Sequence, residues 1–280
     1  MDLIPFSDEV VSSLATVAMY GRGAARVARE GRRRLGREER IVFVVGSPRS
    51  GTTFTAGALG SLPGFVDLGE VRPWRAAIPR LFGRGDDDVA LPLRRILERV
   101  RKLGLANGLR GVEQTPETSF VLAAALQAYP DALAVHVIRD GRDVAASLLE
   151  KGWLNADQHG VPGYDASDDF WVEPDRVDEF ERVSDATRAA WAWRRHVLAA
   201  FAVPERTVQL RYEQLVLDPR AAATALAPRL DVDADLLAHS FGAAHSSSLG
   251  RWRRDLSPEQ VSDVEDEAGD LLAALGYDAG

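Results

Sequence analysis

The sequence predicts an α/β fold, a single domain whose central parallel sheet is flanked by helices. Short apolar runs, typical of parallel strands buried on both faces, alternate with segments of helical period. A turn bracketed by glycines joins the first of these runs to a helix start, as in nucleotide-binding α/β domains. The length of 280 residues allows one large domain with a substantial core.

Each expected element is placed by its own hydrophobic pattern. The expected strands are Ile41–Val45, Gly111–Glu113, Leu133–Ile138 and Thr207–Leu210. The expected helices are 52–61, 91–104, 117–128, 143–151, 180–201, 219–227 and 258–276. Because strands alternate with helices along the chain, we expect the strands to pair in parallel.

The formal charge of the chain is −8, from 34 basic and 42 acidic residues. The segment 155–185 holds ten acidic residues against two arginines and therefore accounts for the whole excess. An acidic chain is not expected to bind nucleic acid, because phosphate affinity requires a basic surface. We find no apolar run long enough to span a bilayer, no signal-peptide pattern and no cysteine, which predicts a cytoplasmic protein without a transmembrane segment.

Two segments stand out within the single domain predicted for 1–280. The N-terminal segment 1–38 is basic and is expected to form a helix from about Ser13 to Arg34. That helix is expected to pack on the domain, and contact with a membrane surface or a partner is the alternative. The acidic segment 154–185 is rich in Gly, Pro and Asp at its start and is expected to form a lid or loop. The sequence does not indicate an oligomeric state.

The segment that follows the first expected strand predicts an anion site. It reads Gly46-Ser-Pro-Arg-Ser-Gly-Thr-Thr-Phe54. Backbone N–H groups at such a helix start converge on an anion. The spacing of Gly46 and Gly51 matches the loop that binds ATP and GTP, but Thr52 occupies the lysine position and a cation, Arg49, lies inside the loop. A planar guanidinium suits phosphate or sulfate oxygens.

A second anion site is expected after the strand at 133–138. This strand ends in Arg139, where a nucleotide triphosphatase has an acid that holds Mg²⁺, so we expect an anion site without a metal. Ser147 lies eight residues later, and Lys151 lies one helical turn beyond it on the same face. The three polar side chains are expected to bind a second phosphate. Alternatively, Arg139 and Asp143 form only a salt-bridged corner.

These blocks resemble the sulfotransferases that use 3′-phosphoadenosine-5′-phosphosulfate (PAPS). Gly46–Phe54 resembles their 5′-phosphosulfate loop, and Arg139 with Ser147 resembles their 3′-phosphate motif. Leu210–Pro219 looks like the strand and turn that follow the lid, and Gly250–Pro258 looks like the C-terminal loop that closes on the nucleotide. An arginine in the first loop is closer to bacterial, protein-tyrosine and carbohydrate-type members. The resemblance therefore implies the P-loop sulfotransferase fold.

The resemblance covers roughly residues 40–277 and implies a reaction. A sulfuryl group would pass in line from PAPS to a hydroxyl or amine of a small-molecule, lipid or carbohydrate acceptor, with release of PAP. The residues that it implies for nucleotide binding are Arg49, Ser50, Gly51, Thr52, Thr53, Arg139, Ser147, Lys151, Tyr212, Ser248, Gly250 and Arg251. Trp252 either stacks on the adenine or packs in the core.

Two residues are expected to carry the chemistry. Arg49 would stabilise the leaving oxygen, and Glu70 would act as general base. Glu70 lies twenty-one residues after Arg49, the spacing at which protein-tyrosine-type members place a catalytic glutamate. An apolar pocket would suit a base, and the expected walls are Phe65, Val66, Leu68 and Trp74. Asp67 and His159 are alternatives to Glu70.

One departure from the family pattern keeps other functions open. Gln114 stands where related members often carry a lysine near the transferring group, which indicates another cation, slow turnover or a different acceptor. The alternatives are a P-loop small-molecule kinase and a catalytically weak protein that binds PAPS or PAP. Thr52 in the lysine position and Arg139 at the strand end count against the kinase.

Overall fold

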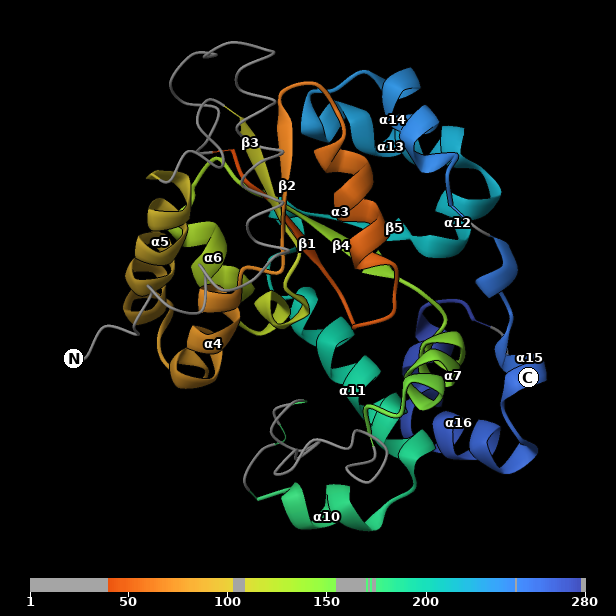
Figure 1. Ribbon diagram of the computed structural model, residues 1–280. Helices are drawn as coiled ribbons and strands as arrows, with labels where there is room; N and C mark the ends of the chain where they lie inside the picture. Colours follow the sequence, from red (N-terminus) through yellow and green to blue (C-terminus); the bar gives the residue numbers. More distant parts are fainter. Residues whose placement is uncertain are drawn as a thin grey trace.

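A computed structural model describes residues 40–102, 109–154, 170, 172, 175–244 and 246–277. Its centre is a five-stranded sheet in the order β2-β3-β1-β4-β5, in which every neighbouring pair is parallel (Figure 1). The predicted α/β fold with a central parallel sheet is therefore confirmed. The strands are β1 (Val42–Val45), β2 (Phe65–Gly69), β3 (Arg110–Glu113), β4 (Leu133–Ile138) and β5 (Thr207–Arg211).

The strand β2 is the one that the sequence analysis missed. It is a five-residue edge strand that pairs with β3 alone, and its register shifts between Asp67 and Gly69. The polar side chain of Asp67 interrupts the apolar pattern of this strand. Its carboxylate accepts a hydrogen bond from the Gly69 amide at 2.8 Å. A short run with an acid in the middle does not carry the continuous hydrophobic signal of a buried strand.

Helices follow the strands in the predicted alternation, and each expected helix is found at its place. The described α-helices are α3 (Thr52–Gly60), α4 (Arg72–Leu81), α5 (Asp86–Lys102), α6 (Leu122–Ala128), α7 (Gly141–Lys151), α10 (Val177–Arg182), α11 (Asp185–Ala200), α12 (Tyr212–Leu217), α13 (Pro219–Leu230), α14 (Ala234–Phe241), α15 (Trp252–Asp255) and α16 (Pro258–Ala274). The expected helix 117–128 is a 3₁₀ turn, η2 (Pro116–Val121), followed by α6. The expected helix 180–201 is two helices, because the Ser184 side chain caps α11 by accepting from the Thr187 amide.

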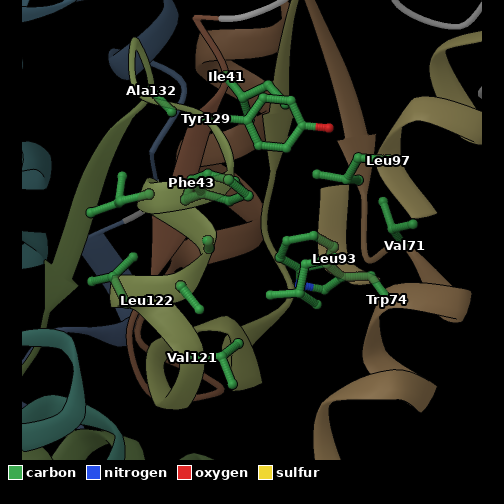
Figure 2. Packing of buried hydrophobic residues seen from close by; sticks show 14 of the residues in the cluster. Ile41, Phe43, Val71, Trp74, Leu93, Leu97, Val121, Leu122, Tyr129 and Ala132 are labelled. Carbon is green, nitrogen blue, oxygen red and sulfur yellow. The ribbon is translucent and has the colours of Figure 1, made fainter. Parts of the chain in front are cut away.

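Two apolar layers enclose the sheet, and β1 contributes to both. Phe43 faces the side covered by α4, α5 and α6, where its ring lies 5.8 Å from that of Trp74 and 6.4 Å from that of Tyr129 (Figure 2). Val42 and Val44 face the opposite side, which α3, α12, α13 and α14 cover (Figure 1). Alternation of buried side chains along β1 explains why its sequence is apolar without a break.

A third group of helices lies at the carboxyl ends of the strands. It consists of α7, α11 and α16, which share their own apolar cluster (Figure 1). Trp193 of α11 is fully buried, and its indole N–H donates to the Arg139 carbonyl at 3.1 Å. A Cβ at Gly141 would lie 2.7 Å from the Trp193 ring, so α11 rests directly on the corner that follows β4.

Two predicted features lie outside the described residues. These are the N-terminal segment 1–38 and most of the acidic segment 154–185, so the basic helix and the lid stay predictions. Among the residues that the structure does describe, no helix is both long enough and apolar enough to cross a membrane.

The buried histidine of β4 makes the stability of the fold depend on pH. His136 is fully buried, as expected of a core residue, and its ring lies 5.0 Å from that of Phe201. Neither ring nitrogen has a hydrogen-bond partner among the described residues. Burial lowers the pKa of His136 to about 3, from an ordinary value of 6.5. Between these values the unfolded chain binds a proton that the folded chain does not, so stability falls as the pH falls.

We expect His136→Leu to reduce this acid sensitivity. Urea unfolding at pH 7.5 and at pH 5 gives the loss of unfolding free energy on acidification for each protein. This loss should be smaller in the variant than in the wild type, and the difference should be at most about 1.4 kcal/mol per pH unit. Part of the loss should remain, because burial also lowers the pKa of His196, to about 4. Equal losses in both proteins would show that His136 titrates normally in the folded state.

Candidate active site

The loop between β1 and α3 has the backbone of an anion-binding turn. Gly46 and Gly51 have φ of 141° and 97°, and a Cβ at Gly46 would lie 2.4 Å from the Val137 carbonyl oxygen. Arg49 also has a positive φ, 70°, which is uncommon for a residue with a side chain. Such local strain is concentrated at functional sites, and here it falls on the predicted cation of the loop.

The N-terminus of α3 leaves main-chain donors available for an anion. The first intrahelical bond runs from the Thr55 amide to the Gly51 carbonyl at 3.0 Å, so the amides of Thr52 and Thr53 have no intrahelical acceptor. The Ser50 amide is not available in this way, because it donates to the Ser47 carbonyl at 3.1 Å inside the loop. The Ser50 hydroxyl is buried and has no hydrogen-bond partner in the described part of the chain.

Tyr212 packs directly against this loop. A Cβ added at Gly51 would lie 2.4 Å from the Tyr212 ring, which explains why position 51 requires glycine on steric as well as conformational grounds. The Tyr212 hydroxyl lies 3.2 Å from the Ser248 hydroxyl. The structure therefore brings two of the predicted C-terminal residues to the loop.

Arg139 and Ser147 meet the loop from β4 and α7. The Arg139 guanidinium donates to the Arg49 carbonyl at 3.2 Å and to the Ser248 carbonyl, and it lies 4.9 Å from the centre of the Tyr212 ring. The Ser147 hydroxyl accepts from Nε of Arg49 at 3.0 Å. Burial, followed by the charge of Arg139, lowers the pKa of Arg49 from its ordinary value. Two guanidinium groups whose charges act on each other suit an anion that binds both.

The salt-bridged corner that we gave as an alternative is also present. Arg139 lies 3.5 Å from Asp143, whose carboxylate accepts from the amides of Gly250 at 2.8 Å and Trp252 at 3.1 Å. The corner does not use every donor of Arg139, because its buried Nε has no partner among the described residues. The two interpretations are therefore compatible.

Two predicted residues form no described hydrogen bond with this network, although the charge of Arg251 contributes to lowering the pKa of Arg49. Arg251 pairs with Glu150 at 2.9 Å and with Asp255 at 2.7 Å. Lys151 is exposed at the C-terminal end of α7, and the described contacts do not join it to the other predicted residues.

Trp252 is buried, and the guanidinium groups of Arg142 and Arg253 lie 4.1 and 4.3 Å from its ring centre, which favours packing over adenine stacking.

A cavity of about 390 Å³ opens beside the loop. Its lining combines two cations, two carboxylates and an aromatic wall, in which the Trp153 ring centre lies 5.5 Å from the Arg49 guanidinium. The lining residues are Pro48, Arg49, Thr52, Thr53, Glu70, Arg75, Pro116, Glu117, Trp153, Phe170 and His196. Arg49 thus reaches both the predicted phosphate network and the cavity.

Glu70 lines this cavity, but its surroundings differ from the expectation. The expected apolar pocket is wrong: Phe65, Val66, Leu68 and Trp74 are core residues that pack in the layers of the sheet. The Glu70 side chain is 42% exposed and lies 3.6 Å from the guanidinium of Arg75. An ion pair, rather than desolvation, therefore fixes its carboxylate.

Arg75 and Glu117 are cavity residues that the sequence analysis missed. Arg75 lies on α4, and its Nε donates to the buried Glu117 carboxylate at 2.9 Å. Gln114 accepts from the Thr53 hydroxyl at 3.2 Å, so the uncharged side chain in the lysine position is tied to the first turn of α3. Arg75 supplies a second cation, and only the tertiary approach of α4 to η2 brings it there.

The turn that carries Gln114 is held by a buried carboxylate. Glu113 is fully buried and accepts from the Thr115 amide at 2.9 Å and the Thr118 hydroxyl at 3.0 Å. Burial raises the pKa of Glu113 to about 8, although both hydrogen bonds act in the opposite direction. This side chain is absent from the cavity lining and orders the cavity wall from behind.

The middle of the chain matches the model of the sulfotransferase family over residues 93–235, just over half of its length. The chain belongs to the sulfotransferase family. It is therefore a transferase whose general chemistry is sulfuryl transfer, and the sequence resemblance is confirmed at the level of the family. No curated protein sequence matches the chain.

Solved sulfotransferases share the fold of this family member at low sequence identity. A sulfotransferase domain from the curacin biosynthetic pathway is 17% identical, with a TM-score of 0.56 over 86% of this chain and 99% of that domain. A Mycobacterium avium sulfotransferase is 14% identical, with a TM-score of 0.56 over 97% of this chain and 89% of its own. A mouse sulfotransferase complexed with PAP is also 14% identical, with a TM-score of 0.52 over 84% and 85% of the two chains.

The contact between the loop and Tyr212 can be tested by a pair of glycine substitutions. We expect Gly51→Ala to lower the free energy of unfolding by about 1–3 kcal/mol, because of its positive φ and the clash with the Tyr212 ring. Gly57→Ala in α3 is the control, since a Cβ there meets open space. This variant should raise the free energy of unfolding, by at most about 1 kcal/mol. Urea unfolding measures both. A neutral Gly51→Ala variant would contradict the contact.

Proposed function

We propose that this sulfotransferase-family protein transfers a sulfuryl group from PAPS to a hydroxyl or amine of a small-molecule, lipid or carbohydrate acceptor and releases PAP. The observation that carries the proposal is the network of Arg49, Arg139 and Ser147 around the loop, directly beside a cavity. The absence of cysteine from the sequence supports a cytoplasmic location.

The donor side fits a nucleotide with two phosphate positions. The amides of Thr52 and Thr53 and the Ser50 hydroxyl would hold the 5′-phosphate, since the described residues leave all three without an acceptor. The Nε of Arg139 and the Ser147 hydroxyl would hold the 3′-phosphate. PAPS bound there supplies an activated sulfuryl group, and Tyr212, Ser248 and Gly250 close its binding site.

Two residues of the cavity would act on the transfer. Glu70 accepts the proton of the acceptor hydroxyl as that oxygen bonds to sulfur and the bond from sulfur to the phosphate oxygen breaks. Arg49 stabilises the negative charge that is left on the phosphate oxygen, an effect typically worth about 3–4 kcal/mol at one preorganised donor. The ion pair with Arg75 orients the Glu70 carboxylate along the cavity wall.

Gln114 in the lysine position motivates the alternative of a weak enzyme that chiefly binds PAPS or PAP. Arg75 counts against this alternative. Its side chain lines the same cavity and carries the positive charge that a lysine at position 114 would otherwise supply. Its two carboxylate partners keep it in place.

Nucleotide binding tests the proposal without knowledge of the acceptor. We expect calorimetric titration to give PAP binding in the absence of metal and weaker binding of ATP with Mg²⁺. Ser147→Ala should weaken PAP binding by about tenfold, because it removes one hydrogen bond to a charged phosphate. Ser240→Ala is the matched control, because Ser240 is a half-buried serine on α14. Metal-dependent ATP binding without PAP binding would instead favour the kinase.

Transfer of radiolabelled sulfate from PAPS into a library of phenols, sugars and lipids tests the base. Glu70→Gln should lower turnover by about 10²–10⁴-fold while PAP binding is kept. Asp67→Asn is the control, because its oxygen still accepts from the Gly69 amide. Loss of turnover in the Asp67 variant alone would move the role of base to that neighbour, and full activity in both would place the base elsewhere.

A further inference from the structure

His196 is a cavity residue that the proposed reaction leaves without a role. It lies on α11, is 2% exposed and belongs to the lining of the cavity beside Arg49. The other walls come from the loop and the start of α3, from Glu70 and α4, from η2, and from Trp153 and Phe170. The periodicity of α11 suggests a core histidine, but the cavity makes it a wall residue.

The hydrogen bond at one ring nitrogen fixes the state of the other. Nδ1 lies 2.8 Å from the Ala192 carbonyl of the same helix. A carbonyl oxygen can only accept, so Nδ1 carries the proton and Nε2 has a free lone pair. Nε2 is buried, and none of the described residues gives it a hydrogen-bond partner. A buried acceptor without a donor costs stability, unless a ligand supplies one.

The surroundings keep this imidazole uncharged. Burial lowers its pKa to about 4; the hydrogen bond to Ala192 opposes this shift, and the charges of Arg195 and Arg75 add to it. Phe120 packs on the ring with centroids 4.6 Å apart. At neutral pH the residue therefore offers an acceptor and no charge.

The remaining walls limit the chemistry of a ligand that meets Nε2. Trp153, Phe170 and two prolines give an apolar surface. The carboxylates of Glu70 and Glu117 share the cation of Arg75, so this part of the cavity has no surplus positive charge for an anion. A ligand with an apolar body and neutral hydrogen-bond donors satisfies both conditions.

We propose that Nε2 of His196 accepts a hydrogen bond from a second donor group of the acceptor substrate. The acceptor is then a neutral compound that carries, on an apolar body, a reacting hydroxyl for Glu70 and a further O–H or N–H for His196. This inference rests on the proposed function, because it takes Glu70 as the partner of the reacting hydroxyl. His196 is thus a specificity residue and not the base.

Pairs of small phenols test the second donor directly. The probes are catechol, resorcinol and hydroquinone, each compared with its monomethyl ether, which keeps one hydroxyl and loses the other donor. With PAP present, we expect calorimetry to show at least one dihydroxybenzene binding about tenfold or more tightly than its ether. His196→Phe keeps an aromatic ring but removes the lone pair, and should reduce that ratio to about one. His196→Gln retains a terminal oxygen and should preserve it.

A spectroscopic measurement on the wild type keeps the test independent of how the variants fold. In protein labelled with ¹⁵N-histidine, the preferred dihydroxybenzene should move the Nε2 resonance of His196. His136 is the internal control: it is buried with both nitrogens unpartnered among the described residues, but it is not part of the cavity lining. Its resonances should not move.

Three results would overturn the inference: equal binding within every pair, a preference that survives in His196→Phe, or an Nε2 resonance that no probe moves. Failure of the proposed function is separate, because it appears as absence of PAP binding to the wild type. In that case the phenol comparison is repeated without PAP and still decides the role of His196.

Discussion

The buried guanidinium of Arg139 joins three segments that are far apart along the chain. It donates to the carbonyl of Arg49 in the loop and to that of Ser248 near the C-terminus, and it pairs with Asp143 at the start of α7. All three partners are acceptors, so only a cation at the end of β4 lets them meet. An acid at this position, as magnesium-dependent nucleotidases have, would repel all three. Arg139, which counts against a magnesium-dependent site, therefore also joins the segments of this site.

Two ion pairs of one arginine also order the cavity. Arg75 serves both the exposed carboxylate of Glu70 and the buried one of Glu117. Glu117 is the buried member of the three, so loss of Arg75 would leave its carboxylate without the ion pair described here. Beyond Arg49, which the Ser147 hydroxyl holds at the mouth of the loop, the cavity has two carboxylates against the one cation of Arg75, and its other walls include Trp153 and Phe170. This division is what the proposed function uses: the anionic donor on the side of the loop and an uncharged acceptor on the other side.

Local chemistry explains what the sequence predicted well. The loop from Gly46 to Thr53 needs only a strand, two glycines and a helix start, all within residues 42–53, so its pattern is visible without tertiary information. The surroundings of Glu70 were predicted wrongly, because Phe65, Val66 and Leu68 form the edge strand β2 and turn into the core. Arg75 and His196 reach the cavity from α4 and α11. The hydrophobic pattern of a helix indicates which of its faces is buried, but it does not indicate which residues that face contacts.

Asp143 gives the C-terminal loop a thermodynamic role. Its carboxylate accepts the amides of Gly250 and Trp252, while its partner Arg139 holds the carbonyls of Ser248 and Arg49. Docking of that loop and occupation of the anion site thus draw on the same pair of side chains. Coupling between two such equilibria is reciprocal. If a bound nucleotide strengthens docking of the loop by some factor, the docked loop strengthens nucleotide binding by the same factor. The C-terminal loop at residues 248–252, remote from the loop at 46–53 in sequence, would in this way contribute to the affinity of the proposed nucleotide site.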